Sequence, residues 1–274
     1  MAVRNFWTIK NDKIQKGEIE FQWEPGMALS QRKKSGANMC MQIEYHAGLR
    51  TLDISRASQS DLGVKLSAFN LMYTGEVLGD AYKMKTVECI YQGSKVFKNK
   101  GSMKYLYNVT SMEAKQVIKK IHDVDVLVGF EFDNRIRVEE ATSVFYDYLY
   151  VTALFENYHS KLDLSMYDAY ADVMLGKGIV ACQARAVCIY KLLQQTNKLD
   201  VVYNWDEFAK WHKEYVEDVY NFSYRTDVMY EIDDDCVRYI GATHISKLLE
   251  KHNLSYIFKG GCTFKIVSKD GSGI

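Results

Sequence analysis

The 274-residue sequence lacks the marks of zinc-binding, membrane-spanning and secreted proteins. Its six cysteines form neither CxxC pairs nor the Cys/His spacing of a zinc site, so we expect reduced thiols and no bound metal. No segment approaches about eighteen uninterrupted apolar residues, and the first residues lack the basic head and apolar run of a secretory signal. These absences predict a cytoplasmic protein that does not bind membranes.

The chain also lacks an excess of charge of either sign. Thirty-five basic residues balance thirty-five acidic ones, so binding to nucleic acid must use a local patch. One such patch is the run at 30–35 (SQRKKS), where Arg32, Lys33 and Lys34 lie beside two hydroxyls and an amide. These groups can hold phosphate oxygens, with a solvated loop as the alternative.

Alternating strands and helices with a Gly-rich phosphate turn are absent, and the GKG stretch at 176–178 lacks the spacing of a P-loop. The hydrophobic patterns predict strands at 17–24 and 50–54, a buried apolar run or short strand at 124–132, and helices at 86–97, 111–121, 143–158, 181–193 and 243–251. We therefore expect a helix-dominated α+β fold. In it the helices at 86–97 and 181–193 face each other across a pocket, and a small antiparallel sheet from the N-terminal third flanks them.

No repeat, low-complexity run or flexible linker divides the sequence. We predict a catalytic domain at 1–198 and a C-terminal extension at 199–274 that packs on it.

The segment 86–97 (TVECIYQGSKVF) carries the most chemistry. Glu88, then Tyr91 or Gln92, and then Lys95 are spaced to share one face of a helix, while apolar residues occupy the other face. Polar groups between residues that favour burial indicate a walled pocket. An ordinary amphipathic helix with a polar stripe is the alternative.

Three blocks together resemble a known family. TVECIYQGSKVF is similar to the signature E-x-x-[YF]-Q-[AG]-x-K-F of the NADAR superfamily, LSAFNL at 66–71 to its upstream loop, and YDAYADVMLGKGIVACQARAVCIYKLL at 167–193 to its closing block. With EFQWEPGMALSQRKKS, the blocks resemble the NADAR branch that accompanies DNA-guanine ADP-ribosyltransferase (DarT-type) toxins as their antitoxin. The resemblance spans about residues 15 to 195 and implies a multihelical NADAR/YbiA-like core with a small antiparallel β element.

Two departures affect the specificity that the resemblance implies. The family's Trp-Gly-Asp-Gly run reads Ala171-Asp172-Val173-Met174, and its usual Asn before the last core helix is Gln183. They bear on the choice of base or ribose rather than on the reaction, because Asp172 keeps an acid in the block.

The resemblance implies an N-glycosidase that removes ADP-ribose from guanine in DNA or nucleotides and reverses toxin modification. Lys95 is then the candidate amine for a Schiff base with the ribose anomeric carbon, and Glu88 the candidate proton shuttle. In the competing assignment Lys95 stays protonated, as an ion-pair partner of Glu88 or a phosphate contact. Glu88 or Asp172 then activates water.

Binding roles follow from side-chain chemistry and from the resemblance. Aromatic rings suit stacking on adenine or guanine, amides suit hydroxyls or a base edge, and cations suit the diphosphate. The candidates are Tyr91, Phe69 and Tyr170 for stacking, Asn70, Gln92 and Gln183 for polar recognition, and Arg32, Lys33 and Lys65 for the diphosphate. A structural role is the alternative for each of them, and for Phe69 it is a place in the core. No cofactor is expected.

Two further functions stay open. One is a non-catalytic ADP-ribose reader or toxin-neutralising protein, with a cognate ADP-ribosyltransferase toxin as its partner. The other is an N-glycosidase for a ribosyl intermediate of the riboflavin pathway. The sequence does not distinguish a bacterial antitoxin from a phage counter-defence protein.

Overall fold

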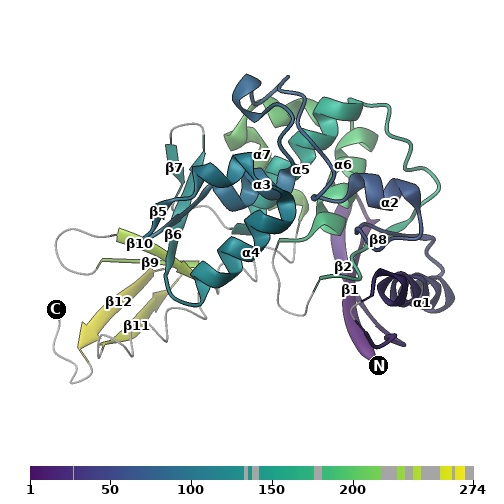
Figure 1. The fold of residues 1–274 in the computed structure, drawn as a ribbon, viewed down its shortest axis with the longest axis horizontal. Coiled ribbons are helices and arrows are strands. Elements are labelled where there is room, and N and C mark those ends of the chain that lie inside the picture. Colours follow the sequence, from purple (N-terminus) through teal and green to yellow (C-terminus); the bar gives the residue numbers. More distant parts are fainter. Residues whose placement is uncertain are drawn as a thin grey trace. The chain divides into compact units, whose positions relative to one another are not determined.

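The computed structural model describes residues 1–26, 28–132, 135–137, 142–175 and 181–216, and the strands at 227–231, 237–241, 254–260 and 263–268 (Figure 1). The helix expected at 243–251 and the GKG stretch lie outside the described residues. The chain forms two compact units. The first contains Met1–Ile90 and Thr142–Val219, and the second contains Tyr91–Ala141 and Tyr220–Ile274.

The sheet of the first unit begins with a hairpin. Strands β1 (Ala2–Lys10) and β2 (Lys13–Phe21) pair in antiparallel register. The two residues between them, Asn11 and Asp12, have φ angles of 52° and 55°. Asn and Asp tolerate this left-handed region, and a two-residue turn with both φ values positive matches the twist of the paired strands. The strand predicted at 17–24 is therefore confirmed in its first part.

Two short strands complete this sheet, whose order is β2-β1-β8-β3. Strand β8 (Ala169–Ala171) runs antiparallel to β1, and strand β3 (Thr51–Asp53) runs parallel to β8. The sheet is thus antiparallel as expected, apart from one parallel pair at its edge. In that pair Asp53 is the register partner of Ala171, so both strands end at the same place.

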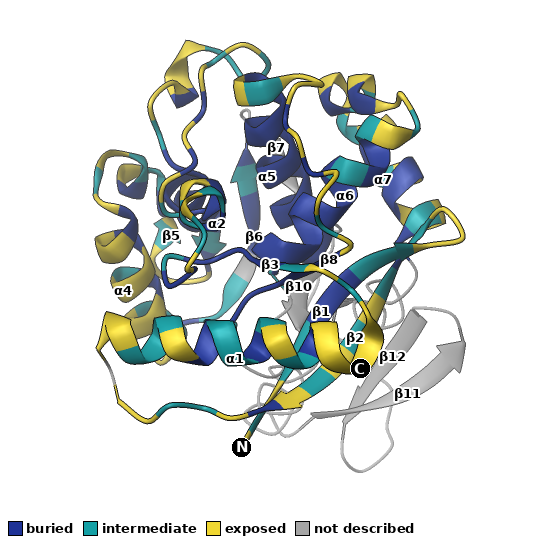
Figure 2. Ribbon diagram, turned by 90° about the vertical axis from the view of Figure 1, so that its right-hand side faces the viewer, coloured by how far each residue is buried: buried dark blue, intermediate teal, exposed yellow. Residues whose placement is uncertain are grey.

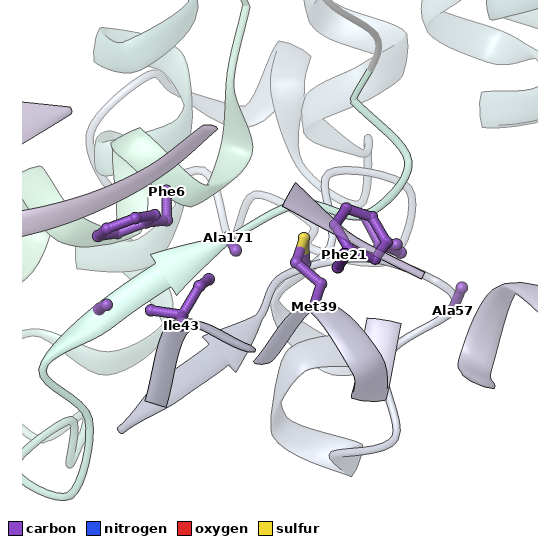
Figure 3. Close-up of a cluster of buried hydrophobic side chains, with 8 residues drawn as sticks. Phe6, Phe21, Met39, Ile43, Ala57 and Ala171 are labelled. Carbon is purple, nitrogen blue, oxygen red and sulfur yellow. The ribbon is translucent and has the colours of Figure 1, made fainter. Parts of the chain in front are cut away.

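Helix α1 (Leu29–Ala47) covers one face of the sheet. Its Met39 and Ile43 pack with Phe6 and Phe21 in a buried cluster that also contains Ala57, Ala169, Ala171 and Val173 (Figure 3). Buried and exposed positions alternate along this helix, as in an amphipathic surface helix (Figure 2). The basic run at 30–35 therefore belongs to the first turns of a helix and not to a loop.

Helices α5 (Thr142–Tyr158) and α6 (Gln183–Gln195) form the hydrophobic centre of the first unit, which confirms the helices predicted at 143–158 and 181–193 (Figure 2). Helix α7 (Trp205–Tyr215) packs on α5 through ring contacts of Trp205 and Phe208 with Tyr148. Helix α2 (Asp61–Leu66) and the 3-10 turns Asp80–Tyr82 and Leu199–Tyr203 complete this unit.

A buried ion cluster joins these three helices. Arg185 of α6 donates Nε–H to Asp147 Oδ2 at 2.6 Å and Nη2–H to Asp147 Oδ1 at 3.0 Å. His212 Nε2 of α7 lies 2.9 Å from the same Asp147 Oδ2. All three residues are at most 2% exposed. Burial lowers the pKa of His212, and its hydrogen bond with Asp147 opposes that shift.

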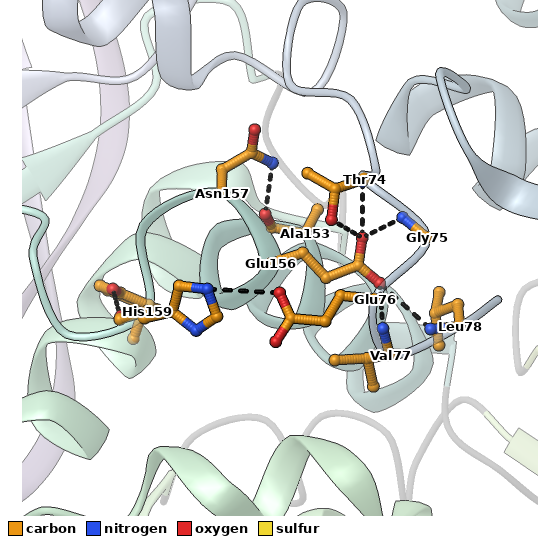
Figure 4. Close-up of polar contacts among 10 residues, drawn as sticks. Thr74, Gly75, Glu76, Val77, Leu78, Ala153, Glu156, Asn157 and His159 are labelled. Carbon is orange, nitrogen blue, oxygen red and sulfur yellow. Dashed lines mark hydrogen bonds and ion pairs between the residues drawn. The ribbon is translucent and has the colours of Figure 1, made fainter. Parts of the chain in front are cut away.

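Another buried carboxylate organises the loop that precedes helix α3. Glu156 near the end of α5 accepts backbone N–H groups from Thr74 (2.7 Å), Gly75 (2.9 Å), Val77 (2.8 Å) and Leu78 (3.1 Å) (Figure 4). Four donors satisfy a charge that is only 3% exposed. The loop is therefore fixed to α5 from within.

Glu156→Gln should destabilise the protein by about 2 to 3 kcal/mol, because an amide NH₂ would point at backbone N–H donors where a carboxylate oxygen now accepts them. Urea unfolding measures the difference. Glu76→Gln in the same loop is the matched control, since Glu76 pairs with His159 where both side chains are more than 40% exposed. It should cost less than about 1 kcal/mol. Equal costs for the two variants would contradict this account.

The second unit contains an antiparallel sheet of order β5-β4-β6-β7. Its strands are β5 (Gly101–Ser102), β4 (Lys95–Phe97), β6 (Leu127–Phe132) and β7 (Arg135–Arg137). The 3-10 turn Lys104–Asn108 leads to helix α4 (Ser111–His122), which starts with a capping box between Thr110 and Glu113. The helix predicted at 111–121 and the strand predicted within 124–132 are confirmed.

Two further hairpins lie in the C-terminal part of the chain. They are β9 (Asp227–Glu231) with β10 (Val237–Gly241), and β11 (Leu254–Gly260) with β12 (Thr263–Ser268). The fold is therefore α+β, as predicted.

The helix predicted at 86–97 is wrong in its second half. Helix α3 (Val87–Gly93) ends at Gly93, and Lys95 begins strand β4. A Cβ at Gly93 would lie 2.3 Å from a ring carbon of Tyr107, so only glycine fits there. Beyond it the Ser94 carbonyl accepts the Glu131 N–H at 2.7 Å, which places this backbone in the sheet. Glu88 and Lys95 therefore do not share a helix face.

Candidate active site

Three of the sequence blocks meet at the backbone of Ala68. The Ala68 N–H donates to Gln183 Oε1 at 2.9 Å, and the Ala68 carbonyl accepts the Glu88 N–H at 3.0 Å. The Leu71 carbonyl accepts the Val87 N–H at 3.0 Å. The upstream loop therefore holds the first turn of α3 on one side and the start of α6 on the other.

Gln183 extends this connection to Asp172. Its Nε2–H donates to Asp172 Oδ2 at 2.8 Å, while its Oε1 also accepts the Ser67 hydroxyl at 3.3 Å. Asp172 Oδ1 accepts the Met174 N–H at 2.9 Å. Glu88, Asp172 and Gln183 are each between 5% and 8% exposed. We call Glu88, Asp172 and Gln183 the acid–amide group of the first unit.

Two residues that the sequence analysis missed lie near this group. Burial, followed by the charge of Glu88, raises the pKa of Tyr146 well above its ordinary value, and Asp172 adds to the shift. Its phenol therefore keeps its proton. Arg4 donates Nε–H to the Val173 carbonyl at 3.4 Å. Burial lowers the pKa of Arg4, and the charge of Asp172 opposes that shift. Neither residue stands in a motif, so pattern alone carried no signal for them.

Asp53 is a third residue that the sequence analysis missed. It is 4% exposed and accepts the Val173 N–H at 3.0 Å and the Ser55 hydroxyl at 2.8 Å. Burial first, and then the charge of Asp172, raise the pKa of Asp53 to about 7. A usable signal existed, because Asp53 lies within the strand predicted at 50–54 and an acid at the end of a strand is a common site residue.

Lys95 lies in the second unit, with an aromatic ring and an imidazole as neighbours. Lys95 is buried and only 7% exposed. The Lys95 Nζ lies 4.8 Å from the Tyr91 ring centroid and 3.4 Å from His122 Nε2. Phe97 contacts the His122 ring edge-on at 5.0 Å. His122, the last residue of α4, was not predicted as a site residue.

Tyr91 and Gln92 precede Lys95 closely in the sequence, and both are buried. Tyr91 is 4% exposed, and its ring stacks on Phe130 at 5.7 Å with an interplanar angle of 27°. Gln92 is 8% exposed. Tyr91 therefore has an aromatic partner and the amine of Lys95 as neighbours within its own unit.

Other predicted binding residues contact the upstream loop and α2. The Arg56 guanidinium lies 4.4 Å above the Phe69 ring, and the Lys65 Nζ lies 5.4 Å from the Tyr158 ring. Asn70 donates Nδ2–H to the Val64 carbonyl at 2.8 Å, which closes the end of α2. Phe69 is half-buried, while Lys65 and Asn70 are exposed.

Arg32 and Tyr170 have different surroundings. Arg32 of α1 donates Nη1–H to Met174 Sδ at 3.8 Å, so it reaches the turn that follows Asp172. Tyr170 in β8 is completely buried, and its ring presents no exposed face. The structure therefore brings Arg32 to Met174, two residues after Asp172, and places Tyr170 in the core.

Within the described residues, no group of three or more His, Cys, Asp or Glu side chains could hold a metal ion. No helix in this part of the chain is long and apolar enough to cross a membrane. Cys40, Cys89, Cys182 and Cys188 are free cysteines, as expected.

An α+β fold whose upstream loop, α3 start and closing block meet at Ala68 defines a NADAR-type domain. The profile of the family described as DarT1-associated NADAR antitoxin matches residues 2–222, and the chain belongs to this family. The family's description assigns the chain to toxin neutralisation and implies a DarT1 toxin as its counterpart. The match extends past residue 198 and includes α7. No curated protein matches the chain.

Proposed function

We propose that the protein is an N-glycosidase that removes ADP-ribose from guanine bases in DNA or nucleotides and so reverses the toxin's modification. Membership of the antitoxin family supports the biological role. The observation that carries the proposal is the convergence on Ala68 of the upstream loop, where Glu88 of the 86–97 block meets Gln183, which holds Asp172 of the same closing block. Paired buried carboxylates are the groups that glycosidic bond cleavage requires.

The reaction begins on the ribose. The guanine exocyclic nitrogen and the ring oxygen share the anomeric carbon, so protonation of the ring oxygen opens the sugar to a protonated imine. The neutral amine of Lys95 adds to this carbon and loses a proton, and guanine departs with a proton on its nitrogen. Water then hydrolyses the Lys95 imine, which returns the amine and releases ADP-ribose.

Lys95 suits this role because it is buried, and burial disfavours the charged form of an amine. We assign Glu88 to the proton transfers at the ring oxygen and guanine nitrogen. Asp172, held by Gln183 and the Met174 N–H, supplies a fixed negative charge against the developing cation. In the competing version Lys95 stays protonated as a phosphate contact, and Glu88 or Asp172 activates water.

Binding roles are assigned by chemistry and by place. Arg32 lies at the turn after Asp172 and suits one end of the diphosphate, with Lys33 and Lys65 as further cations. Phe69, with Arg56 above it, offers a stacking surface beside Ala68. Asn70 and Gln92 are the amides assigned to a base edge, and Tyr91 to stacking.

Incubation of the full chain with ADP-ribosylated guanine DNA should release free ADP-ribose, detected by chromatography and mass. Glu88→Gln should lower the rate at least about 100-fold while ADP-ribose still binds, because the amide keeps the shape but cannot transfer the proton.

Modified guanosine, modified protein and a riboflavin-pathway ribosyl intermediate are the comparison substrates in this assay. Tight binding of modified DNA without release would identify a non-catalytic reader. Release from the riboflavin-pathway compound alone would replace guanine as the substrate.

A further inference from the structure

Two buried aspartates lie where a pair of parallel strands ends. Asp53 is the last residue of β3, and Asp172 directly follows β8. Asp53 and Ala171 are register partners, so the two acids emerge from the same edge of the sheet. They are 4% and 5% exposed. Two carboxylates at this depth cannot both be charged without a large cost.

Asp53 holds the backbone that carries Asp172. Its Oδ1 accepts the N–H of Val173, the residue after Asp172, at 3.0 Å, and its Oδ2 accepts the Ser55 hydroxyl at 2.8 Å. Helix α1 passes close behind, since a Cβ at Gly36 would lie 3.0 Å from Asp53 Oδ2. The carboxyl group of Asp53 is therefore fixed on three sides.

The groups that face this pair come from five elements, including Tyr150 of α5 and Cys182 at the start of α6, which both interact with the charge of Asp172. Asp172 faces Asp53 from the end of β8, and Cys40 faces it from α1. Burial, with the charge of Asp53 added, raises the pKa of Cys40 to about 12, so that thiol is neutral. Arg4 of β1 and Tyr146 of α5 act on Asp172. Burial first, and then the negative charge of Asp172, raise the pKa of Asp53 to about 7.

We propose that Asp53 and Asp172 form a carboxyl pair carrying one proton at neutral pH, in which Asp53 holds the proton and positions Asp172 to face the ligand. The Met174 N–H and the Gln183 amide stabilise the charge on Asp172. The part of this proposal that concerns ligand binding rests on the proposed function, in which the ligand is ADP-ribose with its negatively charged diphosphate. Loss of the Asp53 proton adds a second negative charge beside Asp172 and weakens binding of such a ligand.

Because the pKa of Asp53 is raised in the folded protein, the direction in which stability changes with pH is fixed. The folded protein holds the Asp53 proton up to about pH 7, whereas an unfolded aspartate releases it near pH 4. The folded state therefore binds more protons in this window, and stability falls as pH rises through it. Asp53→Asn removes this fall, because the amide does not titrate.

The test compares wild type, Asp53→Asn and Asp53→Ala as full chains. Asn keeps an oxygen for the Val173 N–H and can donate to the Ser55 hydroxyl, whereas Ala keeps neither. Asp61→Asn, an exposed acid at the start of α2, is the control. Melting temperature is measured from about pH 5 to about pH 8.5, and ADP-ribose affinity by calorimetry over the same range.

From pH 5 to pH 8.5, the wild type should lose at least about 3 °C relative to Asp53→Asn. Its Kd for ADP-ribose should rise about five-fold, while that of Asp53→Asn stays flat. Asp53→Ala should bind more weakly at every pH. Parallel melting curves for wild type and Asp53→Asn, or an unchanged pH dependence of Kd in Asp53→Asn, would overturn the pair. A wild type that does not bind ADP-ribose at any pH would refute the proposed function instead, and the melting curves would still decide the pair.

Discussion

Lys95→Ala should lower the release of ADP-ribose from modified guanine by at least about 1,000-fold, the largest effect on activity that we expect from one substitution. The covalent route has no substitute nucleophile once the amine is removed. Glu88 is intact in this variant, so proton transfer is retained. A contact that only positions the ligand would cost far less. The measurement is single-turnover release of ADP-ribose with enzyme in excess.

Borohydride added during turnover should trap an adduct of ADP-ribose mass on Lys95, because it reduces the imine before water hydrolyses it. Lys95→Arg should abolish both trapping and turnover, since arginine keeps the charge but cannot act as a neutral amine. Lys98→Ala, an exposed lysine just beyond β4, is the control and should behave as wild type. Full activity in Lys95→Arg, or an adduct on Lys65, would move the assignment to water attack driven by Glu88.

Asp147→Ala should destabilise the protein by about 4 kcal/mol, the largest effect on stability among these variants. The Arg185 guanidinium would stay buried without its bidentate carboxylate, and His212 would lose the same partner. Urea unfolding followed by circular dichroism measures the change. Because α5, α6 and α7 each contribute one residue of the cluster, all three helices should loosen together.

A triple variant tests whether the cost comes from the unpaired charge. Asp147→Leu, Arg185→Met and His212→Phe combined should be far less destabilising than Asp147→Ala alone, because no charge stays buried without a partner. Glu214→Ala on the exposed side of α7 is the control and should change stability by less than about 0.5 kcal/mol. A cost for Asp147→Ala as small as that of the control would show that the cluster does not hold the helices.

Helices and strands with clear local patterns were predictable from the sequence. The apolar run at 143–158 and the small-residue helix at 181–193 form α5 and α6 because burial and spacing act within one segment. The helix predicted at 86–97 is wrong in its second half for the opposite reason. Its helical spacing continues to Lys95, but Gly93 meets the Tyr107 ring and Ser94 bonds to Glu131, both distant in sequence. Spacing carries no information about such partners.

The same division applies to the candidate site. The motif blocks identified Glu88, Lys95, Asp172 and Gln183 as candidate site residues. The family match spans all of these blocks. The sequence by itself determined the α+β class, the family and the chemical character of these side chains, because those depend on local order and composition.

The tertiary structure alone decided which groups meet. Gln183 reaches both Ala68 and Asp172, and Asp53 faces Asp172 across 119 positions of the chain, with a hydrogen bond to Val173 that spans 120. A buried carboxyl group takes its pKa from the charges and donors around it, and those come from strands and helices far apart in the sequence. Only folding brings them within reach.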